Sequence, residues 1–301
     1  MHIPIKNWMA GPLILCMSLW TAADVVAQTD STSVPTSSQS SAPLNTDSAR
    51  RVYNINGWVV GGISVAAAAA GILTISPRAK PNYTPAELAA LNPNDVPAFD
   101  RWSLHQDASL IPTYENYSLI LQVTAAAMPL TLLLDDKIRE HGGDAILMAL
   151  EVNAIVVSIY TVSPLGPLFQ TRNRPVVYYH DPEPPVSRAN GNNKNSFYSG
   201  HVASAAGASF CMAKIICDTH PELGSDKFWV YAAASVPPLA MTWVRLKALD
   251  HFPSDIAVGF AIGTICGIVI PELHRINDKS FSLAPYASPN GTGIALQWVP
   301  Q

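Results

Sequence analysis

The sequence predicts an all-α protein, a bundle of about six apolar helices that associates with a membrane. Three observations point to this class. Hydrophobic residues make up 49% of the 301 residues and charged residues only 13%, about half the share that is typical of a soluble domain. Apolar, charge-free runs recur along the chain between polar connections. These runs are rich in Ala and Leu, which favours helix over strand.

Each apolar run corresponds to one expected helix. The runs span residues 52–77, 116–134, 152–171, 202–213, 228–244 and 256–271. Three of them reach the length of about 20 residues that a helix needs to cross a bilayer, and the others are borderline or short. Length therefore leaves two arrangements open, a membrane-spanning bundle and an apolar domain that does not span.

Two long polar connections interrupt the expected helices. Residues 81–113 join the first two runs, and residues 173–198 are irregular and rich in proline. Long irregular segments inside a helical protein usually carry function. Residues 281–301 alternate weakly between apolar and polar and form a C-terminal tail with a short extended piece, to which we assign no role.

The amino-terminal 27 residues resemble an export signal. Lys6 provides a short positive region, residues 8–20 are mostly apolar, and small residues precede Gln28, as in a cleavable signal peptide. An uncleaved membrane anchor is the alternative. Residues 28–50 are rich in Ser and Thr, so we expect a disordered tether. This organisation predicts an exported protein of the bacterial periplasm, or of an inner or outer membrane with its site facing the periplasm.

The helical domain is therefore expected over residues 51–280, with its chemistry between residues 170 and 260. The net charge of −4 and the lack of a recurring basic stripe argue against nucleic acid as a partner. Four scattered cysteines are too few for a disulfide framework. The sequence does not indicate an oligomeric state.

Three short stretches at the ends of expected helices carry groups suited to phosphate. The first holds Arg172 and Arg174, two planar and permanently charged groups. The alternative is that the two arginines interact with the dipole at the end of a helix or flank a membrane. The second places Ser199, Gly200 and His201 where a helix begins, and exposed amides there bind anions. Its alternative is a capping serine followed by a structural histidine.

The third stretch runs from Arg245, a further cation, to Asp255. Pro253 suits the first position of a helix, which places Asp255 in the first turn. From there its carboxylate is expected to reach back and accept the ring N–H of His251. That bond would fix the tautomer and raise the basicity of the other ring nitrogen. The alternative is structural: Asp255 would interact with the dipole at the start of the helix, and His251 would be hydrogen-bonded locally.

Together the three stretches resemble the motifs of the type 2 phosphatidic acid phosphatase superfamily. The family pattern is a Lys, six residues and Arg-Pro, then Pro-Ser-Gly-His, then Ser-Arg, five residues, His, three residues and Asp. Residues 174–175, 199–201 and 245–255 match it in order and in internal spacing. Three positions depart from the pattern, with Pro167, Tyr198 and Val244 in place of the family's Lys, Pro and Ser.

The resemblance implies a phosphatase/haloperoxidase-like helical fold and a role for each motif residue. His251 would attack phosphorus and form a phosphohistidine, with Asp255 orienting its ring. His201 would protonate the leaving oxygen and then help to activate water. The phosphate oxygens would be held by Arg174, Arg245, Ser199 and the amide of Gly200. Arg172 would substitute for the missing lysine. No metal and no cofactor is implied, because the arginines supply the positive charge.

The implied function is a metal-independent phosphatase that acts on a phosphate monoester or diphosphate. The expected partner is a phosphorylated lipid, or a small phosphate ester, and the membrane itself. Two alternatives belong to other classes. A vanadate-dependent haloperoxidase would hold vanadate with the same groups, and a degenerate, non-catalytic envelope protein would bind phosphate or lipid without turnover. The sequence does not choose among phosphorylated substrates.

Overall fold

The computed structural model describes residues 51–74, 79–179, 185–276, 281–288 and 291–298. The expected signal peptide (residues 1–27), the expected tether (28–50) and residues 299–301 lie outside this range. They therefore remain predictions.

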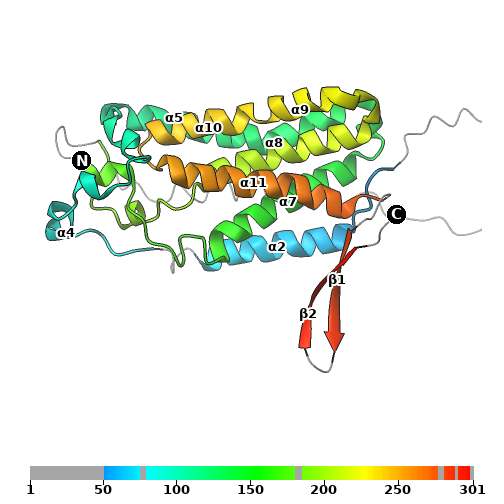
Figure 1. Ribbon diagram of the computed structural model, residues 1–301, viewed down its shortest axis with the longest axis horizontal. Coiled ribbons are helices and arrows are strands. Elements are labelled where there is room, and N and C mark those ends of the chain that lie inside the picture. Colours follow the sequence, from blue (N-terminus) through cyan, green and yellow to red (C-terminus); the bar gives the residue numbers. More distant parts are fainter. Residues whose placement is uncertain (1–50, 75–78, 180–184, 277–280, 289–290, 299–301) are drawn as a thin grey trace, which may run out of the picture. The chain divides into compact units, whose positions relative to one another are not determined.

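The described residues form a bundle of long helices (Figure 1). Its members are α2 (Gly57–Leu73), α5 (Ile111–Ala127), α7 (Gly142–Val162), α8 (Gly200–Thr219), α9 (Lys227–Ala234), α10 (Val236–Lys247) and α11 (Pro253–His274). Ser235 alone separates α9 from α10, and prolines at 237 and 238 follow it, so these two helices share one apolar run. Each of the six apolar runs therefore contains one helical segment, and the predicted fold class is confirmed.

α7 begins before its charge-free run and α8 continues past its own, because the charged residues inside them are paired. In α7, Glu151 is buried, and its carboxylate lies 2.8 Å from Nε2 of His274. In α8, the buried ammonium of Lys214 lies 2.7 Å from Asp218 and 2.5 Å from Glu272. Buried charges are tolerated when they have partners of this kind. A search for uncharged runs therefore ends too early at both positions.

Short helical turns order the connections. The connection from α2 to α5 holds α4 (Pro85–Ala89) and 3₁₀ turns at Pro93–Asp95, Arg101–His105 and Ala108–Leu110. The others are the 3₁₀ turns Met128–Leu134, Pro175–Tyr178, Gly191–Lys194 and Pro221–Asp226, and α6 (Asp136–Arg139). At the start of α4, Thr84 and Glu87 each accept a backbone N–H from the other, which is a capping box. Local hydrogen bonding thus shapes segments that the sequence marked as irregular.

One end of the bundle, called here the motif end, gathers the three predicted stretches. The amide of Ser196 donates to the carbonyl of Arg172 at 2.9 Å, and the amide of Arg174 donates to Asn193 at 2.7 Å. The amide of Val176 donates to Leu249 at 3.2 Å. These bonds join the segments before α8 and α11 to the segment after α7.

The opposite end is closed by a separate set of contacts. Arg51 pairs with Asp144 at 2.9 Å, and the hydroxyl of Tyr53 donates to Asp218 at 2.8 Å. A backbone bridge joins Tyr53 to Arg275, just after α11. Because residue 51 lies at this end and the predicted stretches lie at the other, the chain runs along the bundle three times between them, through α2, α5 and α7.

α8 and α11 pack closely through small residues. Three glycines recur at a spacing of four along α11: Gly259, Gly263 and Gly267. A Cβ added at Gly263 would overlap the carbonyl oxygen of Ala203, so the two backbones are closer than side chains would allow. This approach aligns the starts of both helices, where the amide of Ser199 donates to the carbonyl of Asp255 at 3.2 Å.

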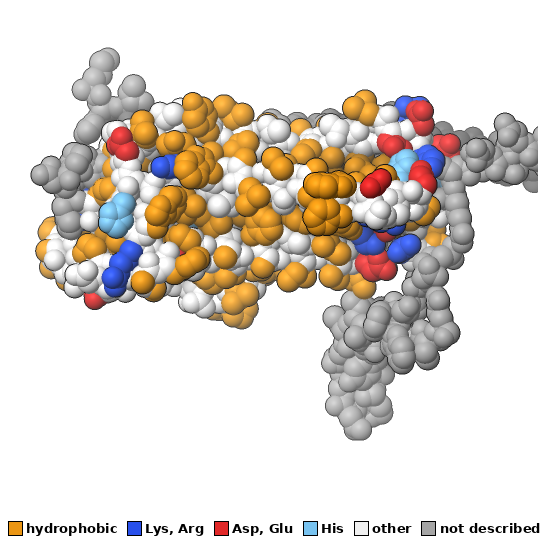
Figure 2. Space-filling model, turned by 45° about the horizontal axis from the view of Figure 1, so that its top comes forward, with side chains coloured by type: hydrophobic (Ala, Val, Ile, Leu, Met, Phe, Trp, Pro, Cys, Tyr) orange, Lys and Arg blue, Asp and Glu red, His pale blue; other side chains and the backbone are white. Residues whose placement is uncertain are grey.

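The sides of the bundle expose many large apolar side chains. Figure 2 shows them spread along the middle of one face, with charged side chains gathered toward its two ends. Among the described residues, four helical segments are long and apolar enough to cross a membrane: Ala108–Leu134, Gly142–Val162, Gly200–Thr219 and Pro253–His274. An apolar surface of this extent is typical of a protein that associates with a membrane.

Exposed aromatic residues lie near both ends of these helices. Trp58 and Phe228 lie near the opposite end of the bundle and are 92% and 67% exposed. At the motif end, the rings of Trp102 and Trp243 are 6.4 Å apart, and the ammonium of Lys247 lies 4.8 Å from the Trp243 ring. Aromatic and basic residues in two such zones are characteristic of the two interfaces of a bilayer.

After α11 the chain forms an antiparallel hairpin of β1 (Phe281–Ser288) and β2 (Gly291–Trp298). The register pairs Phe281 with Trp298 and Ser288 with Gly291. The hairpin adds two strands to the helical domain in the segment expected to be a tail with a short extended piece. Its weak alternation of apolar and polar residues is the usual signal of a strand.

Candidate active site

The structure brings the three predicted stretches into one cluster at the motif end. The carboxylate of Asp250 pairs with Arg174 from the first stretch and, at 2.5 Å, with Arg245 from the third. The segment just before α8 joins through Ser196, whose carbonyl oxygen lies 2.6 Å from Nδ1 of His251. Asp250, Arg245, Ser196 and His251 are all buried, and the Arg174 side chain is 11% exposed. Groups from distant parts of the chain thus share one enclosed site.

His251 is held in a single tautomer. A carbonyl oxygen can only accept, so the short contact between Nδ1 and Ser196 places the ring proton on Nδ1. The lone pair is therefore on Nε2. The ring is 2% exposed, which fixes its orientation. This is the state that a nucleophilic imidazole requires.

The bond predicted between Asp255 and His251 is wrong. The Asp255 carboxylate instead accepts from the Ser196 hydroxyl at 2.6 Å and from the amide of Phe252 at 2.9 Å, and it pairs with Arg172. Asp255 does lie in the first turn of α11, as expected, but from there a carboxylate caps its own helix. Its link to His251 runs through Ser196, whose hydroxyl it holds and whose carbonyl holds the ring.

Arg172, the expected substitute for the family lysine, is paired with two carboxylates. One terminal nitrogen pairs with Asp255, and the other lies 2.6 Å from Asp100. Asp100 is 2% exposed and also accepts from the amide and the hydroxyl of Ser254, at 2.9 and 2.8 Å. Arg172 thus ties the connection before α5 to the start of α11. Its role as a substitute for the lysine that Pro167 replaces stays a prediction.

Ser199, Gly200 and His201 begin α8, as the sequence predicted. Ser199 stands at the N-cap, yet its fully buried hydroxyl makes no capping bond and has no hydrogen-bond partner among the described residues. The same holds for Nε of Arg174 and Nε of Arg245. Because buried polar groups are normally satisfied, these donors are suited to an anion that binds among them.

The charges around the two histidines come from the same three groups. Arg245, Asp250 and Arg174 act on the ring of His201, in the first turn of α8, and on that of His251. Burial, followed by the charges of Arg245 and Arg174, lowers the pKa of His251 well below 6.5. At neutral pH His251 is therefore uncharged.

The Asp250 carboxylate stays ionised in this setting. Burial would raise its pKa, but the charges of Arg174 and Arg245 outweigh burial and hold the pKa below its usual range. Within the described part of the chain, no group of three or more His, Cys, Asp or Glu side chains is arranged to hold a metal ion. The neutral imidazole of His251 thus lies in the field of two guanidinium ions, of Arg174 and Arg245, and of the Asp250 carboxylate.

Sequence reasoning missed four residues that contact the cluster: Asp250, Ser196, Asp100 and Glu115. The first two are only a few positions from motif residues, and that nearness was the available signal. Asp100 lies in a polar connection and Glu115 on α5, with its carboxylate 3.3 Å from Arg245. No local pattern marks these two, because the fold alone brings them to the site.

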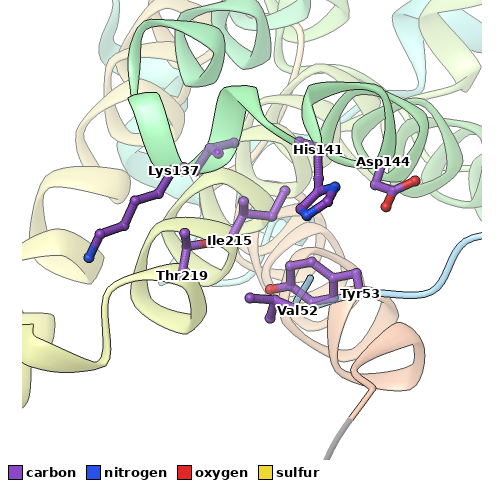
Figure 3. A pocket seen from close by; sticks show the side chains of 9 residues that line it. Val52, Tyr53, Lys137, His141, Asp144, Ile215 and Thr219 are labelled. Atoms are coloured by element: carbon purple, nitrogen blue, oxygen red, sulfur yellow. The ribbon is translucent and has the colours of Figure 1, made fainter. Parts of the chain in front are cut away.

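A cleft of about 280 Å³ lies beside the cluster. It is lined by Asp95, Val96, Pro97, Thr171, Arg172, Asn173, Tyr178 and Phe252. Phe252 directly follows His251 in the chain. A second pocket, shown in Figure 3, lies at the opposite end of the bundle around Tyr53 and His141 and contains none of the predicted site residues.

Comparisons with known proteins agree with the motifs. A model of the PAP2 superfamily (the type 2 phosphatidic acid phosphatases) matches residues 146–279. None of the curated proteins compared with the chain matches it. A crystal structure described as the first transmembrane PAP2 type phosphatidylglycerolphosphate phosphatase, from Bacillus subtilis, aligns at 19% identity with a TM-score of 0.39, over 70% of this chain and 93% of that one. The family match supports a phosphatase of this superfamily. Residues 146–279, which hold all three motifs, thus resemble the PAP2 superfamily.

Proposed function

We propose that the protein is a metal-independent phosphatase that hydrolyses a phosphate monoester or diphosphate of a membrane lipid through a phosphohistidine. The observation that carries this proposal is a set of buried donors, on Arg174, Arg245 and Ser199, that have no hydrogen-bond partner among the described residues. Two of them, Arg174 and Arg245, act on a neutral His251. Phosphoryl transfer needs mainly positioning and positive charge around three oxygens. The two arginines supply that charge.

In the first step, Nε2 of His251 attacks phosphorus, and the bond from phosphorus to the leaving oxygen breaks. The Ser196 carbonyl keeps the proton on Nδ1 and stabilises the positive charge that the ring acquires. Asp255 is a positioning residue here, since it acts through Ser196. The oxygens of the transferred group would be held by the unbonded donors of the cluster and by the amide of Gly200 at the start of α8.

In both steps the proton is handled by His201. It gives a proton to the leaving oxygen as the bond to phosphorus breaks. It then takes a proton from the water that attacks the phosphohistidine, which releases inorganic phosphate and restores neutral His251.

A lipid substrate is favoured by the position of the site. The cluster lies at the ends of apolar helices, beside a zone of exposed aromatic side chains that includes Trp102 and Trp243. A phosphate headgroup could reach the arginines from a bilayer surface while its acyl chains stay in lipid. A small soluble ester lacks this advantage.

The test is phosphate release by detergent-purified protein from phosphatidic acid and from a soluble aryl phosphate. We expect turnover that favours the lipid, is unchanged by EDTA and is blocked by vanadate. Loss of activity in EDTA with recovery on adding a divalent ion would overturn metal independence. Preference for the aryl phosphate would indicate a broad acid phosphatase, and halide oxidation with vanadate and peroxide would indicate the haloperoxidase alternative.

Ser196→Ala should lower kcat for phosphate release about 10- to 100-fold, as is usual for a group that orients a reacting ligand. The backbone carbonyl remains, but the hydroxyl bond to Asp255 that fixes it is lost. Because no substrate contact is removed, KM should change little. Ser209→Ala is the matched control, since Ser209 is also buried and has no hydrogen-bond partner in the described structure. Parent-like kcat in Ser196→Ala would contradict this role.

The pH dependence of kcat/KM should show an acid limb with a midpoint below pH 6.5. The lowered pKa of His251 keeps the nucleophile neutral above that value, and protonation at lower pH removes the lone pair. The profile is measured in detergent beside His220→Ala, which removes a histidine at the opposite end. A limb with its midpoint above pH 6.5 in both proteins would show that His251 is not protected from protonation.

A further inference from the structure

Asp250 is the contact that the motif arginines have in common. Its carboxylate pairs with a terminal nitrogen of Arg174 and lies 2.5 Å from a terminal nitrogen of Arg245. Both arginines are largely shielded from water, with side chains 11% and 4% exposed. Two guanidinium ions in such an environment repel each other, and an unpaired buried charge is strongly unfavourable. A shared carboxylate removes both problems.

The backbone holds Asp250 firmly in this place. Leu249 takes a φ of 58°, in the left-handed region that non-glycine residues seldom adopt. Its side chain is fully buried and its carbonyl accepts from the amide of Val176. The carbonyl oxygen of Asp250 lies 3.3 Å from the hydroxyl oxygen of Ser196. The turn before His251 therefore presents the carboxylate in one direction.

The contacts of each arginine leave a particular edge unused. In Arg245, one terminal nitrogen donates to Ser118 at 3.0 Å and lies near Glu115, and the other meets Asp250. In Arg174, a terminal nitrogen meets Asp250. Nε of both arginines has no hydrogen-bond partner among the described residues. The carboxylate thus occupies the ends of the two guanidinium groups and leaves Nε of each to another acceptor.

We propose that Asp250 is a positioning residue, which holds Arg174 and Arg245 side by side so that their Nε edges receive the phosphate of the substrate. The inference rests on the proposed function. It gives a role to a residue that immediately precedes the nucleophile in sequence. Phosphate affinity then depends on the spacing that Asp250 imposes, because the arginines would separate without it.

The test compares Asp250→Asn and Asp250→Glu with the parent protein, using vanadate and inorganic phosphate as probes. Binding is measured by inhibition of turnover and, independently of activity, by protection against thermal unfolding. The vanadate concentration for half-protection should rise at least about 10-fold in Asp250→Asn, as for other groups that orient a binding residue. Asp250→Glu keeps the charge with a longer side chain, and a smaller increase is expected.

Asp218→Asn is the matched control. It breaks a buried ion pair with Lys214 at the opposite end of the bundle, so it should lower stability while leaving vanadate binding at the parent's value. Vanadate binding by Asp250→Asn that equals or exceeds the parent's would overturn the inference, since Asp250 would then compete with the anion. If Asp250→Asn does not fold, unchanged binding in Asp250→Glu would overturn it. No vanadate binding by the parent would overturn the proposed function, and this inference with it.

Discussion

Replacing His251 by Ala is expected to lower phosphate release from both a lipid phosphate and an aryl phosphate by more than about 10³-fold, the scale of losing a nucleophile. The polar contact of the ring is with the Ser196 carbonyl, and Arg174 and Arg245 keep their pairs with Asp250 when the ring is removed. The variant should therefore fold and still bind vanadate. The measurement is initial rate per folded protein, with vanadate protection against thermal unfolding as the check on the site.

His220→Ala is the control for this experiment. His220 contacts Asp135 and Glu222 at the opposite end of the bundle, so its loss should leave the rate near the parent's. A second test is trapping of the covalent intermediate, because acid-labile phosphate should be found on the parent and not on His251→Ala. Turnover by His251→Ala within tenfold of the parent would show that His251 is not the nucleophile.

Gly263→Leu should destabilise the protein by about 3 kcal/mol or more, since overpacking of this kind forces backbone shifts. A Cβ at this position already overlaps the carbonyl of Ala203 on α8, and a carbonyl in a helix cannot rotate away. For a domain of this size the loss corresponds to a fall in Tm of roughly 6–12 °C. Because Ser199 and Asp255 lie where these helices begin, activity should fall as well.

Gly62→Ala is the matched glycine variant. Gly62 is exposed on α2, and a Cβ there meets nothing within 4 Å. Alanine favours helix over glycine by up to about 1 kcal/mol, so its Tm should be equal to or above that of the parent. Thermal unfolding in detergent measures both variants. Equal Tm values for Gly263→Leu and the parent would show that α8 and α11 can separate without cost.

The sequence predicted the fold better than it predicted helix lengths. Apolar runs of helical composition are a signal carried by each segment alone, and all six correspond to helical segments in the structure. The start of α7 and the end of α8 were missed because each contains a paired charged residue. Glu151 contacts His274 on α11, and Lys214 contacts Glu272 on α11 and Asp218 in its own helix. Such pairing is a property of the packed bundle and has no local sequence signature.

For the site, short patterns predicted which residues meet but not every bond between them. Arg174, Arg245 and His251 lie in one cluster, as expected from their motifs. The predicted bond from Asp255 to His251 was wrong because the Ser196 hydroxyl and the Phe252 amide donate to that carboxylate, while the Ser196 carbonyl accepts the ring N–H of His251. The pairing of Arg172 with Asp100 was not predicted because Asp100 comes from a connection that precedes α5. Contacts of this range follow from the fold only.

The chain runs along the bundle three times between Arg51 and the motif end, and this number decides on which side of a membrane each of them lies. If the bundle spans a bilayer, an odd number of crossings places Arg51 and the substrate-binding end on opposite sides. A site that faces the periplasm then requires Arg51 to be cytoplasmic, whereas export of the residues before it turns the site toward the cytoplasm. The two sequence-based expectations about location are thus mutually exclusive for a spanning bundle. Labelling Arg51→Cys with a membrane-impermeant maleimide, in a protein that also carries Cys16→Ser and with Cys211, Cys217 and Cys266 buried, shows on which side Arg51 lies and so on which side the substrate binds.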